Sequence, residues 1–175
     1  MSRRFGVFSL RDERYPDRRV SVTRNVDAPA QALFDLLADP AKHVLLDGSG
    51  TVRASSDRSP RRLALGSRFA MRMHLVVPYR VVNSVVDFEE GRRIAWRHFG
   101  GHRWIWELEP LDGAARTRVT EIFDWSSARA PGLIELLGYP ARNEHAMLAS
   151  LERLEKLVEL EDSRGTGRRA ETAGC

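Results

Sequence analysis

Two histidines and three tryptophans surround a glycine pair in the segment RIAWRHFGGHRWIWELEP, residues 93–110. A neutral imidazole can exchange protons near physiological pH, so His98 is a candidate general acid or base. The three indoles, Trp96, Trp104 and Trp106, each add a large apolar surface with a single N–H donor. Together these residue types indicate a site for an apolar molecule with a few polar groups.

Strand alternation decides which way these rings point. A two-residue turn made of Gly100 and Gly101 alone would mix charged and apolar side chains on both faces of the hairpin. A loop of odd length separates them, because a one-residue shift moves every side chain to the opposite face. Arg93 then lies opposite Glu109. On the other face, the pairs are Ile94 with Leu108, Trp96 with Trp106, and His98 with Trp104. We therefore predict that the tryptophans and His98 point inward together.

Three further residues are candidates for acid–base chemistry: Tyr79, Asn83 and Glu121. A cyclase or dehydratase needs a proton donor or acceptor held in a dry cavity beside a polarised carbonyl. The segments that carry these residues, YRVVNSVVDF and VTEIFDW, are apolar or nearly so on both alternations. Alternation therefore does not determine which face of either strand points inward. An exposed or core-capping polar group is the simpler interpretation of each, and a hydrogen-bonded interior histidine is the simpler interpretation of His98.

The remaining histidines give no metal motif. Positions 43, 74, 98, 102 and 145 are scattered, and the single cysteine is Cys175. We predict neither a metal site nor a cofactor. His74 shares its alternation phase with Arg72 and is expected in solvent, whereas His43 is equally well explained as a surface residue.

A run of strands must position the candidate residues. The turn signals EEG, GG and LDG separate short segments of strand type, which indicates an antiparallel meander. Apolar spacing predicts a short helix in DAPAQALFDLLADP and a second helical turn from Lys42 to Leu45 before the strands. We expect strands at 20–26, 51–55, 67–76, 79–89, 92–98, 103–110 and 115–125, a helical turn at 131–138 and a long helix from about 141 to 161.

The long helix supplies a partner for the aromatic face. Met147, Leu151, Leu154 and Val158 form one stripe at helical spacing. Met71 and Met73 share one face of the 67–76 strand. A helix that crosses a curved sheet need not fill all the space beneath it. The predicted ligand-binding residues are Met71, Met73, Trp96, His98, Trp104, Trp106, Met147 and Leu151.

Four segments give the chain a family resemblance: VDAPAQALFDLLADPAKH, VVDFEEGRRIAWR, TRVTEIFDWS and LASLERLEKLVE. From about residue 20 to 160 the sequence resembles the START-like, or SRPBCC, superfamily of polyketide cyclase/dehydrase and lipid-transport type. The resemblance implies an α+β helix-grip fold: a curved antiparallel sheet of six to seven strands around a long C-terminal helix, with two short helices after the first strand. It also implies a cavity that often holds a lipid, polyketide or sterol. The family has no universal catalytic motif, so the resemblance assigns no catalytic residue.

Length favours one domain. A chain of 175 residues with 42% hydrophobic residues suits a single core at residues 20–161. Residues 1–19 form an arginine-rich leader, expected to be partly disordered, and residues 162–175 an apolar-poor tail, expected to be disordered.

Net charge and cysteine content limit the expected classes of partner and the expected cell compartment. The net charge of +4 resides in the leader and tail, which leaves the predicted domain neutral and disfavours nucleic acid as a partner. No signal peptide or membrane span is evident, and a lone cysteine fits a reducing cytoplasm.

The leading hypothesis is a protein that binds or carries a small apolar molecule, because the candidate residues form no concerted catalytic set. An aromatase/cyclase- or dehydratase-type enzyme that uses the acid–base candidates is the alternative, and an interaction module with arginine-rich ends is a third. Ligand identity, pathway and oligomeric state stay open.

Overall fold

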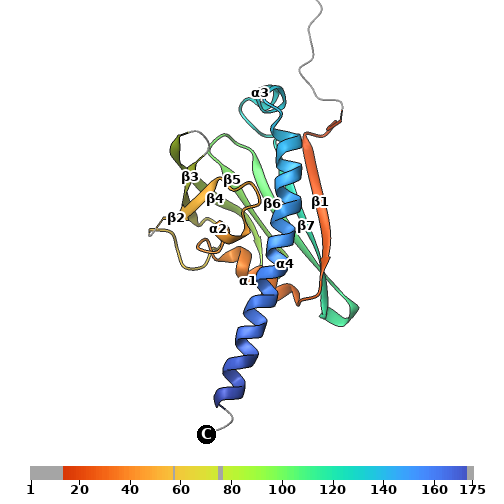
Figure 1. Cartoon of the computed structure of the whole chain (residues 1–175). Coiled ribbons are helices and arrows are strands. Elements are labelled where there is room, and N and C mark those ends of the chain that lie inside the picture. Colours follow the sequence, from red (N-terminus) through yellow and green to blue (C-terminus); the bar gives the residue numbers. More distant parts are fainter. Residues whose placement is uncertain (1–13, 57, 75–76, 173–175) are drawn as a thin grey trace, which may run out of the picture.

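The computed structural model describes residues 14–56, 58–74 and 77–172, with side chains described up to residue 163 (Figure 1). Seven antiparallel strands form one sheet in the order β1-β7-β6-β5-β4-β3-β2. Consecutive strands from β2 to β7 are neighbours, as expected for a meander, and β1 joins at the β7 edge. The strands are β1 (Arg19–Val26), β2 (Val52–Ser55), β3 (Arg68–His74), β4 (Pro78–Glu89), β5 (Arg93–His98), β6 (Arg103–Leu111) and β7 (Arg116–Asp124).

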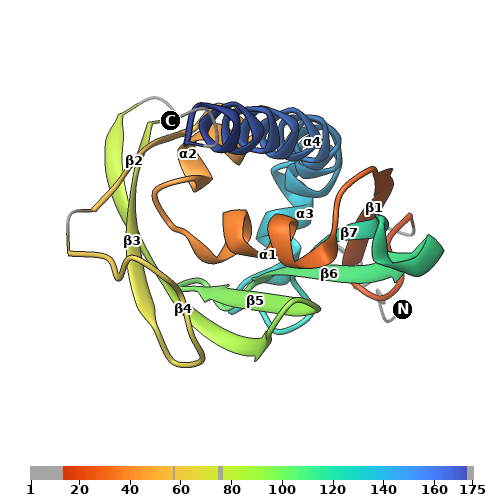
Figure 2. The same cartoon turned by 90° about the horizontal axis from the view of Figure 1, so that it is seen from below.

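The helices lie on one face of this sheet. Two short helices, α1 (Ala30–Ala38) and α2 (His43–Leu46), follow β1, and α3 (Pro131–Leu136) precedes the long α4 (Tyr139–Thr172). A single 3-10 turn, η1 (Asp112–Ala114), joins β6 to β7. The sheet curves around α1 and α2, and α4 closes the open side (Figure 2). The predicted α+β helix-grip fold is therefore confirmed.

The apolar stripe of α4 packs as the sequence predicts. Met147, Leu151, Leu154 and Val158 are all buried. An ion pair between Arg24 and Glu155 joins the helix to β1. The helix continues to Thr172, past the expected end near residue 161, and extends beyond the sheet (Figure 1). The stripe marks where the helix packs rather than where it ends, because backbone hydrogen bonds continue without a partner surface.

The β5–β6 hairpin has the predicted faces but a different register. Trp96 pairs with Trp104 and Ile94 with Trp106, two residues away from the expected pairing. The three-residue loop closes with the N–H of His98 donating to the carbonyl of His102. A register shift of two residues keeps every side chain on the same face, so the tryptophans still point inward as predicted. Arg93 consequently lies opposite Glu107, with which it forms an ion pair, and not opposite Glu109.

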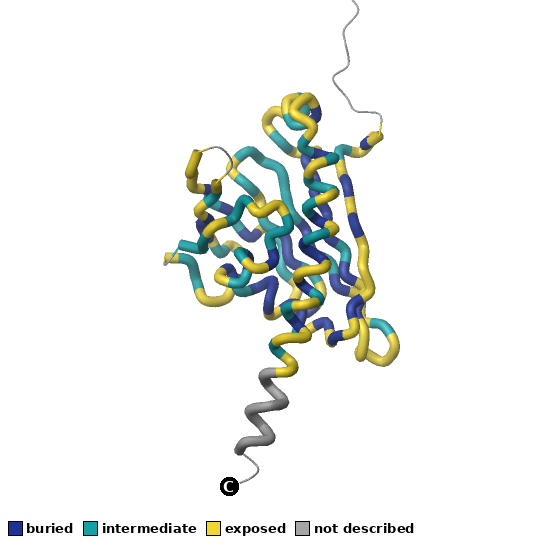
Figure 3. Tube along the Cα trace, in the orientation of Figure 1, coloured by how far each residue is buried: buried dark blue, intermediate teal, exposed yellow. Residues whose placement is uncertain are grey.

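Residues before β1 belong to the core. Tyr15 is buried edge-on against Trp125, with ring centroids 5.5 Å apart. The indole N–H of Trp125 donates to Glu135 Oε1 at 2.9 Å, and Arg18 pairs with the same carboxylate at 3.0 Å. These contacts join the start of β1, the end of β7 and α3. Buried positions alternate with exposed ones along the strands and concentrate between the sheet and α4 (Figure 3).

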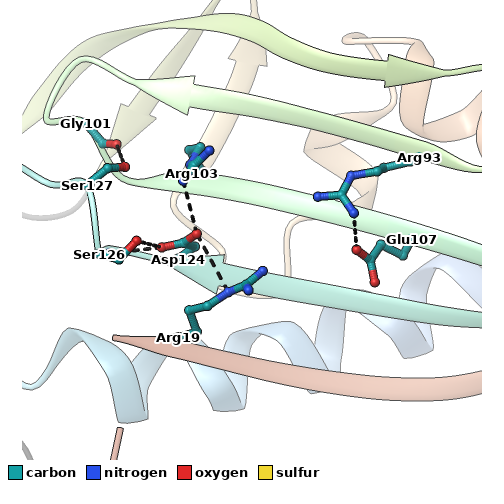
Figure 4. A network of polar contacts seen from close by, with 8 residues as sticks. All are labelled: Arg19, Arg93, Gly101, Arg103, Glu107, Asp124, Ser126 and Ser127. Carbon is teal, nitrogen blue, oxygen red and sulfur yellow. Dashed lines mark hydrogen bonds and ion pairs between the residues drawn. The ribbon is translucent and has the colours of Figure 1, made fainter. Parts of the chain in front are cut away.

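A polar network fixes the hairpin loop to the end of β7 (Figure 4). Asp124 is buried and accepts hydrogen bonds from the backbone N–H and hydroxyl of Ser126, at 2.9 and 2.6 Å, and it pairs with Arg19 and Arg103. Gly101 adopts a φ of 95°, and a Cβ there would lie 2.7 Å from the carbonyl oxygen of Ser127. Only glycine therefore allows this approach of the two loops.

A second glycine allows α2 to approach α4. A Cβ on Gly48 would lie 2.0 Å from the carbonyl oxygen of Ala146 and 2.6 Å from the backbone nitrogen of Ser150. The Gly48 N–H instead donates to the Ser150 hydroxyl at 3.0 Å. The segment after α2 is thus held directly against the backbone of the long helix.

Candidate functional site

A cavity of about 1270 Å³ lies between the concave face of the sheet and the helices. Strands β3 to β7 contribute its floor, and α2, α3 and the first turns of α4 contribute its walls. Its lining is mainly aromatic and aliphatic, with few polar groups. The curvature that makes room for it is helped by a bulge in β4 between Val85 and Asp87, since bulges bend and twist a strand.

The cavity brings together nearly all of the residues selected from the sequence. Leu151 is the exception, because it lies in the solid core beneath α4 and does not reach the cavity. The four acid–base candidates share the same space with the predicted ligand contacts. Lining residues from the sequence prediction are Met71, Met73, Tyr79, Asn83, Trp96, His98, Trp104, Trp106, Glu121 and Met147.

Aromatic rings wall the cavity in two groups, one around Trp96 and one around Phe123. Trp96 stacks on His43 with centroids 5.0 Å apart and meets Phe69 edge-on at 5.8 Å. Trp104 and Phe123 lie 4.9 Å apart on the neighbouring strands. Because stacked and edge-on rings restrain one another, this wall presents a preformed apolar surface.

His43 is a site residue that the sequence did not reveal. It is buried, and its Nε2 is 2.8 Å from the carbonyl oxygen of Leu37. Burial lowers the pKa of His43, so the ring is neutral. The surface interpretation failed because α2 is only four residues long, too short for its periodicity to show which side faces inward.

His98 and His102 stack on each other, with ring centroids 4.4 Å apart and planes 21° apart. Burial lowers the pKa of His98 to about 3, helped by repulsion from His102. Burial lowers the pKa of His102 to about 4. Both rings are therefore neutral at physiological pH, and Nδ1 of His98 has no hydrogen-bond partner among the described residues.

Glu121 lies opposite Trp106 in the β6–β7 register. Only 5% of Glu121 and 3% of Trp106 is exposed. Neither Glu121 Oε2 nor Trp106 Nε1 has a hydrogen-bond partner within the described ranges. Burial raises the pKa of Glu121 well above its usual range, with a smaller contribution from the negative charge of Asp47. Burial therefore favours the protonated, uncharged form of the Glu121 carboxyl group.

Asn83 lies opposite His98 in the β4–β5 register and is likewise buried. Its Oδ1 is without a partner in the part of the chain that the structure describes. Buried polar atoms are normally hydrogen-bonded, so several unpartnered ones around one cavity point to groups that an occupant would satisfy.

The mouth of the cavity lies beside α3 and the β5–β6 loop. Phe99, Leu133 and Leu137 are exposed there, together with Arg129 and Arg142. Tyr79 is 43% exposed, and burial of its remainder raises the pKa of its hydroxyl. His74 is exposed, which confirms its predicted place in solvent.

No group of three or more His, Cys, Asp or Glu side chains suited to a metal ion occurs among the described residues. Within the same residues, no helix has both the length and the apolar character needed to cross a bilayer.

A curved antiparallel sheet that grips a long C-terminal helix over an apolar cavity defines a helix-grip protein with a hydrophobic-ligand-binding fold. The family model described as "Polyketide cyclase / dehydrase and lipid transport" matches residues 17–159. The chain belongs to this family.

The chain is also similar to proteins from several other bacteria. The uncharacterized protein Rv0088 of Mycobacterium tuberculosis is 42% identical over 141 residues, which cover 78% of this chain and 62% of that protein. A solution structure from Arthrobacter aurescens has a TM-score of 0.65 at 15% identity, covering 85% of this chain and 90% of its own. An AHSA1-like protein from Aeromonas hydrophila has a TM-score of 0.57 at 16% identity, covering 82% and 94%. At these identities the solved structures support the fold alone.

Proposed function

We propose that this protein binds and carries a small hydrophobic molecule, such as a lipid or polyketide, in the cavity beneath α4. The observation that carries the proposal is the cavity itself: about 1270 Å³, walled by aromatic and aliphatic side chains, with a few buried polar atoms left unpartnered. Sites with this character take up apolar ligands and use the scattered polar groups to orient them.

The charge distribution supports an uncharged ligand body. His43, His98 and His102 are kept neutral by burial, and burial favours the protonated form of Glu121. Of the charged lining residues, Arg129 and Arg142 are exposed at the mouth, and the half-buried Asp47 carboxylate accepts hydrogen bonds from the backbone N–H groups of Ser49 and Val52. Because an unpaired charge is costly inside an apolar cavity, a neutral interior favours a neutral guest.

A matched pair of substitutions on β4 tests the proposal. Val81 is buried and lines the cavity, whereas its neighbour Val82 faces the other side of the sheet. Val81→Trp should project an indole ring into the cavity and weaken binding of pyrene and of oleate by about tenfold or more. Val82→Trp should leave both affinities within about twofold. Calorimetric titration of the three proteins measures the difference, and equal affinities in all three would refute cavity binding.

A second candidate function is acid–base catalysis of cyclase or dehydratase type. It is favoured by one observation: a neutral imidazole, His98, and the amide of Asn83, which lies opposite it in the β4–β5 register, line the same cavity. A proton acceptor beside a hydrogen-bond donor for the carbonyl oxygen, both held away from water, is the minimum for enolising a ketone.

Deuterium exchange into 1-tetralone tests this chemistry, because only the carbon next to its carbonyl exchanges. Catalysis predicts exchange faster than in buffer and its loss in His98→Ala, with binding retained. Exchange at the buffer rate in the wild-type protein would exclude this activity for a simple ketone.

A further inference from the structure

The Trp106–Glu121 pair lies at the inner end of the cavity. His98 adjoins the loop at the mouth, and Ile94, four residues earlier on β5, pairs with Trp106. At about 3.3 Å per residue, the pair lies about 13 Å further along the strand than His98. The burial of the side chains agrees with this depth, because Trp106 and Glu121 are almost fully buried whereas His98 is only partly buried.

Two polar atoms at this inner end have no hydrogen-bond partner among the residues that the structure describes. Trp106 Nε1 is an N–H donor, and Glu121 Oε2 belongs to a carboxyl group that donates when protonated and also accepts. No ion pair reaches Glu121 within the described part of the chain, so nothing there compensates a negative charge. An unsatisfied buried polar atom destabilises the fold, and a bound ligand that supplies the missing partner removes that cost.

The chemistry of the pair selects among ligand groups. An ammonium ion would pair with the carboxylate but would leave the Trp106 N–H without an acceptor. An anion would accept from Trp106 but would face the carboxyl group and the nearby Asp47. An uncharged oxygen satisfies both, because it accepts from the indole and exchanges a hydrogen bond with the carboxylic acid.

We propose that Trp106 and Glu121 form a recognition subsite for an uncharged hydroxyl or carbonyl oxygen at the inner end of a ring-shaped apolar ligand. The ring lies against Trp104 and Phe123, which occupy the next inward-facing row of the same strands. This inference rests on the proposed cavity binding and adds to it the ligand's orientation and its buried polar group.

A matched set of probes tests separately whether the cavity binds a ring-shaped ligand and whether the subsite recognises an uncharged oxygen. Pyrene, 1-hydroxypyrene and 1-pyrenemethylammonium share one ring system and differ only in the attached group. The subsite predicts that 1-hydroxypyrene binds about tenfold tighter than pyrene and that the ammonium probe gains nothing. Pyrene binding without any preference for the hydroxyl would overturn the subsite and leave cavity binding intact. Failure of all three probes to bind would overturn both.

Variants identify the groups responsible. Trp106→Phe and Glu121→Leu should each reduce the preference for 1-hydroxypyrene over pyrene to less than about threefold. Glu121→Gln should keep the preference, because a neutral amide also donates and accepts. Glu109→Gln, on the outer face of β6, is the matched control. A preference that survives both Trp106→Phe and Glu121→Leu would overturn the assignment.

The wild-type protein provides a readout that does not depend on variant folding. When 1-hydroxypyrene binds, the indole proton of Trp106 should move downfield relative to its position in the pyrene complex, because it gains an acceptor. The indole protons of Trp96 and Trp104 should not move further in that comparison. An unmoved Trp106 signal would contradict the subsite.

Discussion

The rings of His98 and His102 stack 4.4 Å apart where the β5–β6 hairpin meets the cavity mouth. Two imidazoles in this contact cannot both take up a proton at low cost, and burial adds to that cost. The pKa values are accordingly lowered to about 3 for His98 and to about 4 for His102.

Acid should therefore destabilise the fold through these two rings. Their pKa values are lowered on folding from 6.5, so the unfolded chain binds protons that the folded chain does not. Their contribution to stability is complete above pH 6.5 and is lost as pH falls toward 4 and then 3. The double variant His98→Gln/His102→Gln should show a smaller decrease in unfolding free energy over that range, measured by urea denaturation. His74→Gln, at an exposed position, should retain the full decrease; equal decreases in all three proteins would contradict the prediction.

Glu121 should produce the opposite pH dependence. Its pKa is raised on folding, so the folded chain holds a proton that the unfolded chain releases above pH 4.5. The stability that it contributes is present below pH 4.5 and is lost as pH rises. Glu121→Gln removes the titration, so its stability relative to the wild type should increase between pH 4 and pH 7. Thermal melts at the two pH values measure this, and an unchanged difference would show that Glu121 is ionised in the fold.

Gly48 should be intolerant of any side chain. Its missing Cβ would clash with backbone atoms of Ala146 and Ser150, which cannot move without displacing α4. Gly48→Ala should lower the unfolding free energy by about 1–3 kcal/mol. Gly100→Ala, where the nearest atom to a new Cβ is a side-chain atom of His102 at 3.4 Å, should change it by less than about 0.5 kcal/mol. Similar losses in both variants would contradict the close approach.

The sequence predicted the fold because its signals are periodic. Alternation in β5 and β6 assigned the inward face, and the stripe from Met147 to Val158 assigned the packed face of α4. The hairpin register was wrong by two residues, since Glu107 and Glu109 lie on the same face and either can oppose Arg93. Alternation determines the face; the loop contacts of Gly101 determine the register.

The candidate site was less predictable where periodicity is weak. Strand β4 carries apolar residues on both faces, and around Glu121 strand β7 has Ile122 on one face and Phe123 on the other. The paired register shows that Asn83 and Glu121 point into the cavity. Leu151 shares the helix stripe with Met147 but lies over solid core, because the cavity ends before it. A stripe shows which residues face the sheet but not where the sheet curves away.

Indole resonances test the central claim most directly. Trp96, Trp104 and Trp106 line the cavity, whereas Trp125 is fully buried outside it with its N–H bonded to Glu135. In a nitrogen-15 labelled protein titrated with pyrene, cavity binding predicts that the indole signals of the first three tryptophans shift and that the Trp125 signal moves far less. Single Trp→Phe variants assign each signal to its residue. A ligand site beneath α4 would be contradicted if the signals of all three lining tryptophans stay fixed, or if only the Trp125 signal moves.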